Sequence, residues 1–242
     1  MMTILHVIFG TAALFSVPAA LFVRKGGAWH RRFGTAFSIA MSVVLFSAAF
    51  MWQAKGHLFL VPLAVVSGYL IVNGWRVVAR RRRRVRSRLQ DGIDIALSGV
   101  AAAAGGAAAY LGIAATTPLL LSIRPALIGI GTIAIAFGLN DVLGFYGARM
   151  RLGWLLAHFA AMLAAYVSAV TAFVVINAHD VPMMLRWLVP SSIGGGVIVA
   201  YTLRFTPLRF PVASATALAH RFRVLSAQSL RFGRKTGPGR TR

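Results

Sequence analysis

The sequence predicts an all-α protein: a polytopic transmembrane bundle of about seven helices, with the N-terminus outside and the C-terminus in the cytoplasm. Three observations predict this class. Hydrophobic residues make up 58% of the 242 residues and charged residues only 12%, whereas soluble domains are about 45–50% apolar and about 25% charged. The apolar residues fall in runs long enough to cross a bilayer, and the cations fall between alternate runs. A soluble globular domain is therefore excluded.

Each expected span is an apolar run of about 18 to 25 residues, because a helix rises about 1.5 Å per residue and must cross about 30 Å of hydrocarbon. The runs are continuous rather than alternating and are rich in Ala, Gly and Leu, which favours packed helices over a barrel. The expected spans cover residues 2–23, 33–52, 58–78, 92–113, 119–146, 153–176 and 187–203. The last of these is the shortest.

Lysine and arginine residues predict the orientation, because cationic loops stay in the cytoplasm. Of the 26 Lys and Arg residues, 23 follow the first, third, fifth and seventh spans, and only Lys55, Arg124 and Arg186 lie on the other side. An odd number of spans with an outer N-terminus satisfies every loop at once. The chain is thus expected to comprise a seven-span domain over residues 1–203 and a basic, partly disordered cytoplasmic tail over residues 204–242.

A run of arginines directly follows the third span, and juxtamembrane arginines bind the headgroups of anionic lipids. No aromatic residues interleave with this run as a base-stacking surface would require, so nucleic acid is not an expected partner. The expected lipid contacts are Arg80, Arg81, Arg82, Arg83, Arg84, Arg86 and Arg88. The expected surroundings are the lipid bilayer and its anionic headgroups.

Ionisable residues within spans mark functional positions, because each costs about 2.5 kcal/mol or more in hydrocarbon. Asp141 lies eight residues before Arg149 and His158 seven residues after Arg151, so both sit roughly 10 to 12 Å above the same cytoplasmic loop. Each also lies on a stripe of small residues suited to helix contact. We expect a hydrogen bond or ion pair between Asp141 and His158, acting either as a site or only as a staple between the two spans.

Other polar residues are expected near the same depth and complete a candidate intramembrane polar site. Its members are Asp141, His158, His30, Asn73 and Asn140. A carboxylate beside an imidazole can hold a proton near physiological pH, which suits a proton relay. Asp94 lies nearer the cytoplasm, and it also has a simpler explanation, since acids in the first turn of a helix favour its N-terminus and can pair with Arg86 or Arg88.

Histidines provide a second set of candidate ligands, for a metal or a haem iron. The candidates are His6, His57, His158 and His179. Outer histidines and an inner pair formed by His30 and His158 are reminiscent of a b-type cytochrome with a haem near each membrane face, so haem b is the candidate cofactor. The spacing forms no local motif such as HExxH, and the absence of cysteine excludes thiolate metal sites and c-type haem.

Enzyme signatures do not fit this chain. It has no GxSxG, no Gly-rich phosphate loop after a strand and no paired carboxylates with acid and base roles, so hydrolase and kinase chemistry are not expected.

Two stretches form a recurring pattern: the helix that opens with Leu5-His6, and the first loop, which ends in His30-Arg31-Arg32-Phe33-Gly34. On these residues the chain resembles an uncharacterised family of bacterial multi-pass membrane proteins whose first helix starts with Leu-His and whose first loop ends in His-Arg-x-x-Gly. Relatives carry His-Leu-Trp-Arg-Met in the sixth span, where this chain has His158-Phe159-Ala160-Ala161-Met162. The resemblance implies His6, His30, Asp141 and His158 as motif positions, but no activity, cofactor or substrate.

These patterns predict a multi-pass protein of the bacterial inner membrane, with three hypotheses for its activity. The first is a small transport or proton-relay protein built on the Asp141 and His158 site. The second is a haem-binding electron-transfer protein with His6 and His158 among its ligands. The third is a structural or assembly factor whose basic loops dock lipid or a partner, for which Arg80 to Arg84 would matter more than Asp141.

Overall fold

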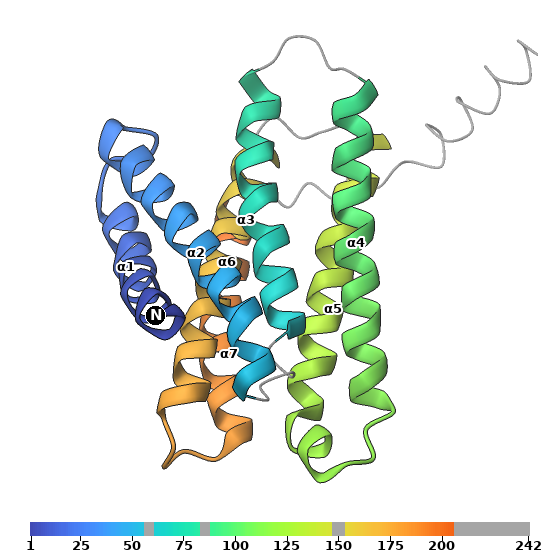
Figure 1. Ribbon diagram of the computed structural model, residues 1–242. Coiled ribbons are helices and arrows are strands. Elements are labelled where there is room, and N and C mark those ends of the chain that lie inside the picture. Colours follow the sequence, from blue (N-terminus) through green and yellow to red (C-terminus); the bar gives the residue numbers. More distant parts are fainter. Residues whose placement is uncertain (56–60, 83–87, 147–152, 206–242) are drawn as a thin grey trace, which may run out of the picture. The chain divides into compact units, whose positions relative to one another are not determined.

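The computed structural model describes residues 1–55, 61–82, 88–146 and 153–205. By its internal contacts the chain forms two units, Met1–Thr202 and Leu203–Arg242. Within the second unit only residues 203–205, which end the last helix, are described, so the expected basic tail lies outside the described residues. The helices are α1 (Met2–Phe22), α2 (Ala28–Lys55), α3 (Val61–Arg82), α4 (Arg88–Ile113), α5 (Pro118–Tyr146), α6 (Gly153–Asn177) and α7 (Met183–Phe205) (Figure 1).

The expected fold class is confirmed. All seven described helices are long and apolar enough to cross a membrane, and the described residues contain no strand. The chain is therefore an integral membrane protein. Three helices begin well before the expected residue, α2 at Ala28, α4 at Arg88 and α7 at Met183, because arginines and leucines near a helix end favour the helix and cationic side chains reach past the apolar core to the interface.

α3 is the central helix of the first unit. Half of its spanning segment is buried inside the protein, compared with 22% for α1, α2 and α5. It contacts α2, α4, α5 and α6, whereas α1 packs mainly on α2, and α4 mainly on α5. Polar residues on several sides of α3 can therefore contact a neighbouring helix. In each of the other helices, most of the spanning segment is not buried inside the protein.

Glycines bring α4 and α5 into very close contact. A Cβ atom added at Gly131 would lie 2.5 Å from the carbonyl oxygen of Gly105, and one added at Gly138 would lie 2.8 Å from that of Ser98. Such spacing leaves no room for a side chain, and close backbone approach is how helices associate in lipid. α4 and α5 thus form one tightly packed pair, and α3 lies against it.

The turn between α6 and α7 is held by Arg186. Its guanidinium donates hydrogen bonds to the main-chain oxygens of Val175, His179 and Val181. The carbonyl groups at the end of a helix have no partner within the helix, and a cation placed there satisfies them. Arg186, expected only as a loop cation, therefore serves as the C-terminal cap of α6.

Candidate functional site

Six polar residues from three helices line a small pocket, together with Leu97. We call these six residues the polar cluster: Tyr69, Asn73 and Arg76 on α3, Asp94 and Ser98 on α4, and Asp141 on α5. Spacings of four and three residues place the α3 members on one face of that helix. The α4 members are four residues apart and share a face in the same way. The cluster therefore lies between α3 and the α4–α5 pair.

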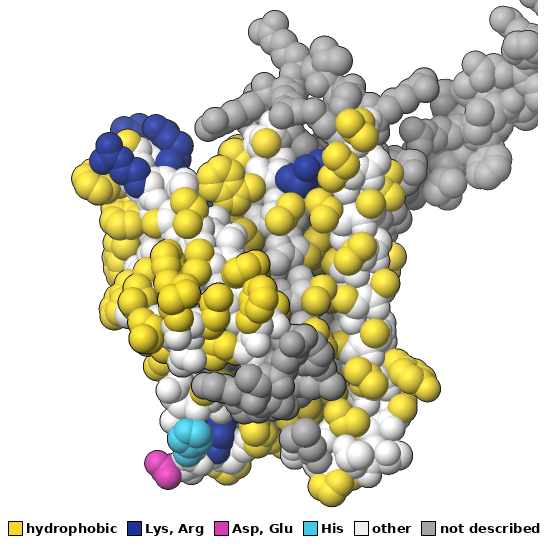
Figure 2. Space-filling view, in the orientation of Figure 1, with side chains coloured by type: hydrophobic (Ala, Val, Ile, Leu, Met, Phe, Trp, Pro, Cys, Tyr) yellow, Lys and Arg dark blue, Asp and Glu magenta, His cyan; other side chains and the backbone are white. Residues whose placement is uncertain are grey.

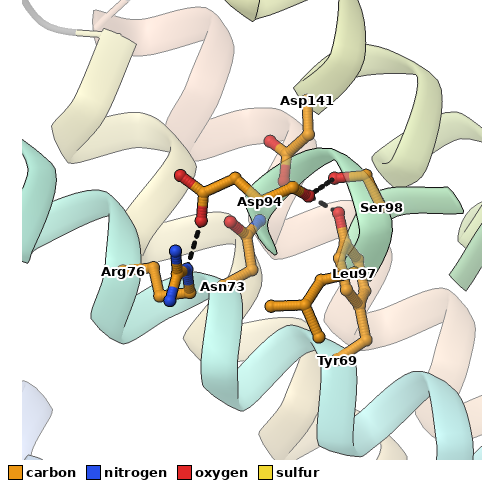
Figure 3. Close-up of a pocket in the computed structure, with 7 residues that line it drawn as sticks. All are labelled: Tyr69, Asn73, Arg76, Asp94, Leu97, Ser98 and Asp141. Carbon is orange, nitrogen blue, oxygen red and sulfur yellow. Dashed lines mark hydrogen bonds and ion pairs between the residues drawn. The ribbon is translucent and has the colours of Figure 1, made fainter. Parts of the chain in front are cut away.

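Hydrogen bonds and one ion pair cross this interface (Figure 3). The Tyr69 hydroxyl donates to Asp141 Oδ2 at 2.8 Å, joining α3 to α5. The Arg76 guanidinium donates through Nε to Asp94 Oδ1, joining α3 to α4. Asn73, which lies between Tyr69 and Arg76 along α3, is buried and lines the same pocket. Both of these bonds include a carboxylate, so the charge of the two aspartates bears directly on this interface.

The two carboxylates are unusual because the chain has so few. It contains four acidic residues in all, and two of them, Asp94 and Asp141, meet in this one pocket with 3% and 8% of their surface exposed. Burying an ionised carboxylate is costly unless it is paired and hydrogen-bonded. Ordinary helix packing requires no such groups, so their convergence marks the polar cluster as the candidate functional site.

The polar cluster lies near the end of α3 and the start of α4, where the arginine run is found. Arg76 lies six residues before the end of α3 and Asp94 six residues after the start of α4, about 9 Å from either helix end. The Arg76 side chain is 28% exposed, whereas that of Asp94 is 2% exposed. Arg76 is therefore the partly exposed partner of this ion pair, and Asp94 the buried one.

The space between the lining side chains has no room for a water molecule. A metabolite would need the helices to move apart before it could enter. A proton needs no such space, because it passes along hydrogen bonds between hydroxyl and carboxyl groups. The geometry of the closed pocket thus suits proton transfer better than the binding of a larger ligand.

The expected bond between Asp141 and His158 is not formed, and this expectation was wrong. Asp141 accepts from Tyr69, whereas His158 Nδ1 lies 2.9 Å from the main-chain oxygen of Gly74. The two residues do meet α3 within one and a half turns of each other, but on different sides of it. The expectation assumed that consecutive spans pack together, whereas α6 packs mainly on α3 and α5 mainly on α4.

His158 and His30 have the same kind of partner. His30 Nδ1 lies 3.1 Å from the main-chain oxygen of Ala20, as His158 Nδ1 lies near that of Gly74. A carbonyl oxygen only accepts, so in both rings Nδ1 carries the proton of the bond and Nε2 holds the lone pair of the neutral ring. Both histidines are therefore oriented by the main chain of another helix, and neither lines the pocket of the polar cluster. Asn140 is in α5, and its side chain is not among those described.

The outer histidines are distributed among different surroundings. His6 Nδ1 lies 2.9 Å from Ser47 Oγ, which joins α1 to α2. His179 is exposed in the turn after α6, and His57 lies outside the described residues. Among the residues that the structure describes, no three His, Asp or Glu side chains gather as metal ligands. That His6, His57 and His179 are ligands of a metal or a haem iron stays a prediction.

The arginine run is only partly covered by the structure. Arg80, Arg81 and Arg82 form the last turn of α3 and Arg88 begins α4, but their side chains are not described. Arg83, Arg84 and Arg86 lie outside the described residues. Their contacts with anionic lipid stay a prediction.

Three members of the polar cluster were not predicted from the sequence. Arg76 was counted only as a loop cation, and Tyr69 and Ser98 had no assigned role. The signals that pointed to them were the spacing of Tyr69, Asn73 and Arg76 along one face of α3 and the four-residue spacing of Asp94 and Ser98 on α4. Asp94 pairs with Arg76 on α3, a partner that the sequence did not suggest. Arg86 and the side chain of Arg88 are not described, so a pairing of Asp94 with either of them stays a prediction.

No family model, no curated protein and no solved structure matches this chain.

Proposed function

We propose that this integral membrane protein is a small transport or proton-relay protein, with the polar cluster as the site that takes up and releases the proton. The observation that supports it best is the burial of two of the four acidic residues, Asp94 and Asp141, beside Arg76 and Tyr69 at a contact between three helices. Ionisable groups inside membrane spans are rare, and proton pathways are among their recognised uses.

The chemistry follows from the two pairs. While Asp141 is ionised, it accepts the Tyr69 hydrogen bond. When Asp141 takes up a proton, its carboxyl group becomes a donor and the Tyr69 hydroxyl can act as acceptor. A proton on Asp94 removes the charge that holds Arg76. Proton uptake thus weakens the contacts of α3 with the α4–α5 pair, and proton loss restores them.

The tight packing of α4 on α5 gives this change a mechanical consequence. Because Gly105 and Gly131 bring the two backbones into contact, α4 and α5 move as one body. α3 meets that body through the polar cluster. A change of charge there therefore shifts the position of α3 against the pair, as in carriers where one bundle moves against another around a fixed site.

We further propose that the protein resides in the cytoplasmic membrane of a bacterium, with its N-terminus outside. The positions of the basic residues support this orientation. The Leu5-His6 and His30-Arg31 patterns support membership of the uncharacterised bacterial family that the sequence resembles.

Reconstituted vesicles test the proposal. Full-length protein is placed in liposomes that contain a pH-sensitive dye, and proton flux is followed after a pH step. We expect flux above that of protein-free liposomes, and we expect Asp141→Asn to abolish it while the protein still folds. The matched control is Asp180→Asn, which removes an exposed carboxylate from the turn after α6. Wild-type protein without flux, or Asp141→Asn with wild-type flux, contradicts the proposal.

A b-type haem protein is the second candidate, because the His30 and His158 rings each bond a main-chain oxygen through Nδ1. A carbonyl partner at one ring nitrogen is how metal-binding histidines are usually held, with the other nitrogen facing the metal. Visible spectra of protein purified from haem-replete cells, before and after dithionite, test this candidate. A band that shifts on reduction supports it, and a flat spectrum excludes it.

A further inference from the structure

The turn between α1 and α2 is a compact structure with a fixed backbone. Gly26 has a φ of +74°, a conformation that glycine adopts without strain. The Gly27 N–H donates to the Arg24 carbonyl at 3.0 Å, and Arg31 Nη1 donates to the Gly26 carbonyl at 2.7 Å. These bonds close the chain into a tight loop whose side chains project from defined positions.

This turn concentrates positive charge at one end of the helices. Four cations fall within nine residues, and Figure 2 shows cationic side chains gathered over the turn, beside hydrophobic ones. They are Arg24, Lys25, Arg31 and Arg32, and all four are exposed. The first acidic residue of the chain is Asp91, and the first turn of α2 has none. No acidic side chain of the turn or of α1 and α2 compensates this charge.

The cations are not equivalent. Lys25 Nζ donates to the main-chain oxygens of Ala20 and Leu21 and so caps the end of α1. Burial there lowers the pKa of Lys25 from its ordinary value. Arginine stays charged in any environment and has a planar group that matches the oxygens of a phosphate. Arg24 and Arg32 are therefore the residues best suited to hold an anion.

Exposed aromatic rings lie next to these cations. The Arg32 guanidinium lies 4.9 Å from the centre of the Trp29 ring, and Trp29 stacks on Phe33 at 5.9 Å. Trp29 is 59% exposed and Phe22, at the end of α1, is 92% exposed. Tryptophan is enriched where membrane headgroups meet the acyl chains, because its ring is apolar and its N–H is polar.

We propose that this turn is a binding site for the phosphate headgroup of an anionic phospholipid, with Arg24 and Arg32 as its ligands and Trp29 against the glycerol region. The charge without acidic compensation favours an anion, and the exposed rings favour a lipid over a soluble anion. The site shares no residue with the polar cluster or with the Arg80 to Arg88 run, so it stands whether or not the protein carries protons.

Native mass spectrometry of the full-length protein tests the site. Delipidated protein in detergent is titrated with phosphatidylglycerol or with phosphatidylcholine. We expect selective binding of phosphatidylglycerol, weakened about fivefold for each arginine removed in Arg24→Gln with Arg32→Gln. The control, Arg240→Gln with Arg242→Gln, makes the same change in net charge in the tail and should keep the wild-type affinity.

A second measurement locates the lipid. Phosphatidylglycerol with a photoreactive group near its glycerol should crosslink to the peptide that contains Trp29, and the double variant of the turn should lose this product. The proposal is overturned if the tail variant loses as much affinity as the turn variant, or if no crosslink maps to the turn. Displacement of the lipid by inorganic phosphate alone would identify a soluble-anion site and would also overturn it.

Discussion

The Tyr69 hydroxyl on α3 donates a hydrogen bond of 2.8 Å to Asp141 Oδ2 on α5. Both residues are buried, so this bond is shielded from water. A change in the protonation of Asp141 therefore acts directly on the hydrogen bond with Tyr69. In the proposed proton relay, Tyr69 is the hydroxyl through which α3 responds to Asp141.

We expect Tyr69→Phe to slow proton flux without abolishing it, because the phenyl ring keeps the packing and removes the donor. The free energy of unfolding should fall by about 1 kcal/mol. The control is Tyr166→Phe, since the described contact of Tyr166 is the ring contact with Phe37 at 6.4 Å. Flux in liposomes and thermal unfolding in detergent measure both effects. Equal results for the two variants would contradict a role for the Tyr69 hydroxyl.

The Arg76–Asp94 ion pair predicts a strong interaction between two substitutions. Arg76→Gln alone leaves the buried Asp94 charge without its guanidinium, and we expect a loss of up to about 3 kcal/mol in the free energy of unfolding. Arg76→Gln combined with Asp94→Asn should be more stable than Arg76→Gln, because the buried charge is removed as well. Thermal unfolding of both single variants and the double variant gives the coupling. Additive effects would show that the interaction energy between Arg76 and Asp94 is zero, which would contradict this prediction.

The close contact of α4 and α5 predicts opposite results for two neighbouring glycines. Gly131→Ala places a Cβ 2.5 Å from the Gly105 oxygen, and we expect it to destabilise the protein by about 1–3 kcal/mol. Gly129→Ala meets no atom within 4 Å, and the better helix propensity of alanine should leave stability unchanged or higher. The unfolding temperatures of the two variants in one detergent measure the difference. A tolerated Gly131→Ala would mean that the helices are not in backbone contact.

The cap formed by Arg186 predicts a local effect. Arg186→Ala removes the donor to three main-chain oxygens, including those of Val175 and His179, and should expose the end of α6 to faster hydrogen exchange. Arg186→Lys keeps the charge but not the planar group, so it should restore only part of the protection. Hydrogen exchange of the turn peptide should rise while that of α4 stays constant. A uniform rise over the whole chain would indicate global destabilisation instead.

Hydropathy and charge alone were sufficient to predict which segments of the chain form the seven described helices. Apolar runs at residues 119–146 and 153–176 became α5 and α6 with almost the same bounds, because the bilayer sets how many apolar residues a span requires. The first residues of α2, α4 and α7 were less well predicted. Ala28 and Met183 begin helices in stretches with charged residues, where hydropathy does not distinguish a helix end from a loop.

The partners of the buried polar groups were decided by tertiary structure. The sequence places Asp141 and His158 at similar depths, because depth depends only on the number of residues from a charged loop. Which helix lies beside which is set by packing: glycines join α5 to α4, and Gly74 admits α6 against α3. Asp141 therefore meets Tyr69, Asp94 meets Arg76, and His158 meets the main chain of Gly74. The sequence determined the spans and their buried polar residues, whereas side-chain volume at the helix contacts determined how those residues were paired.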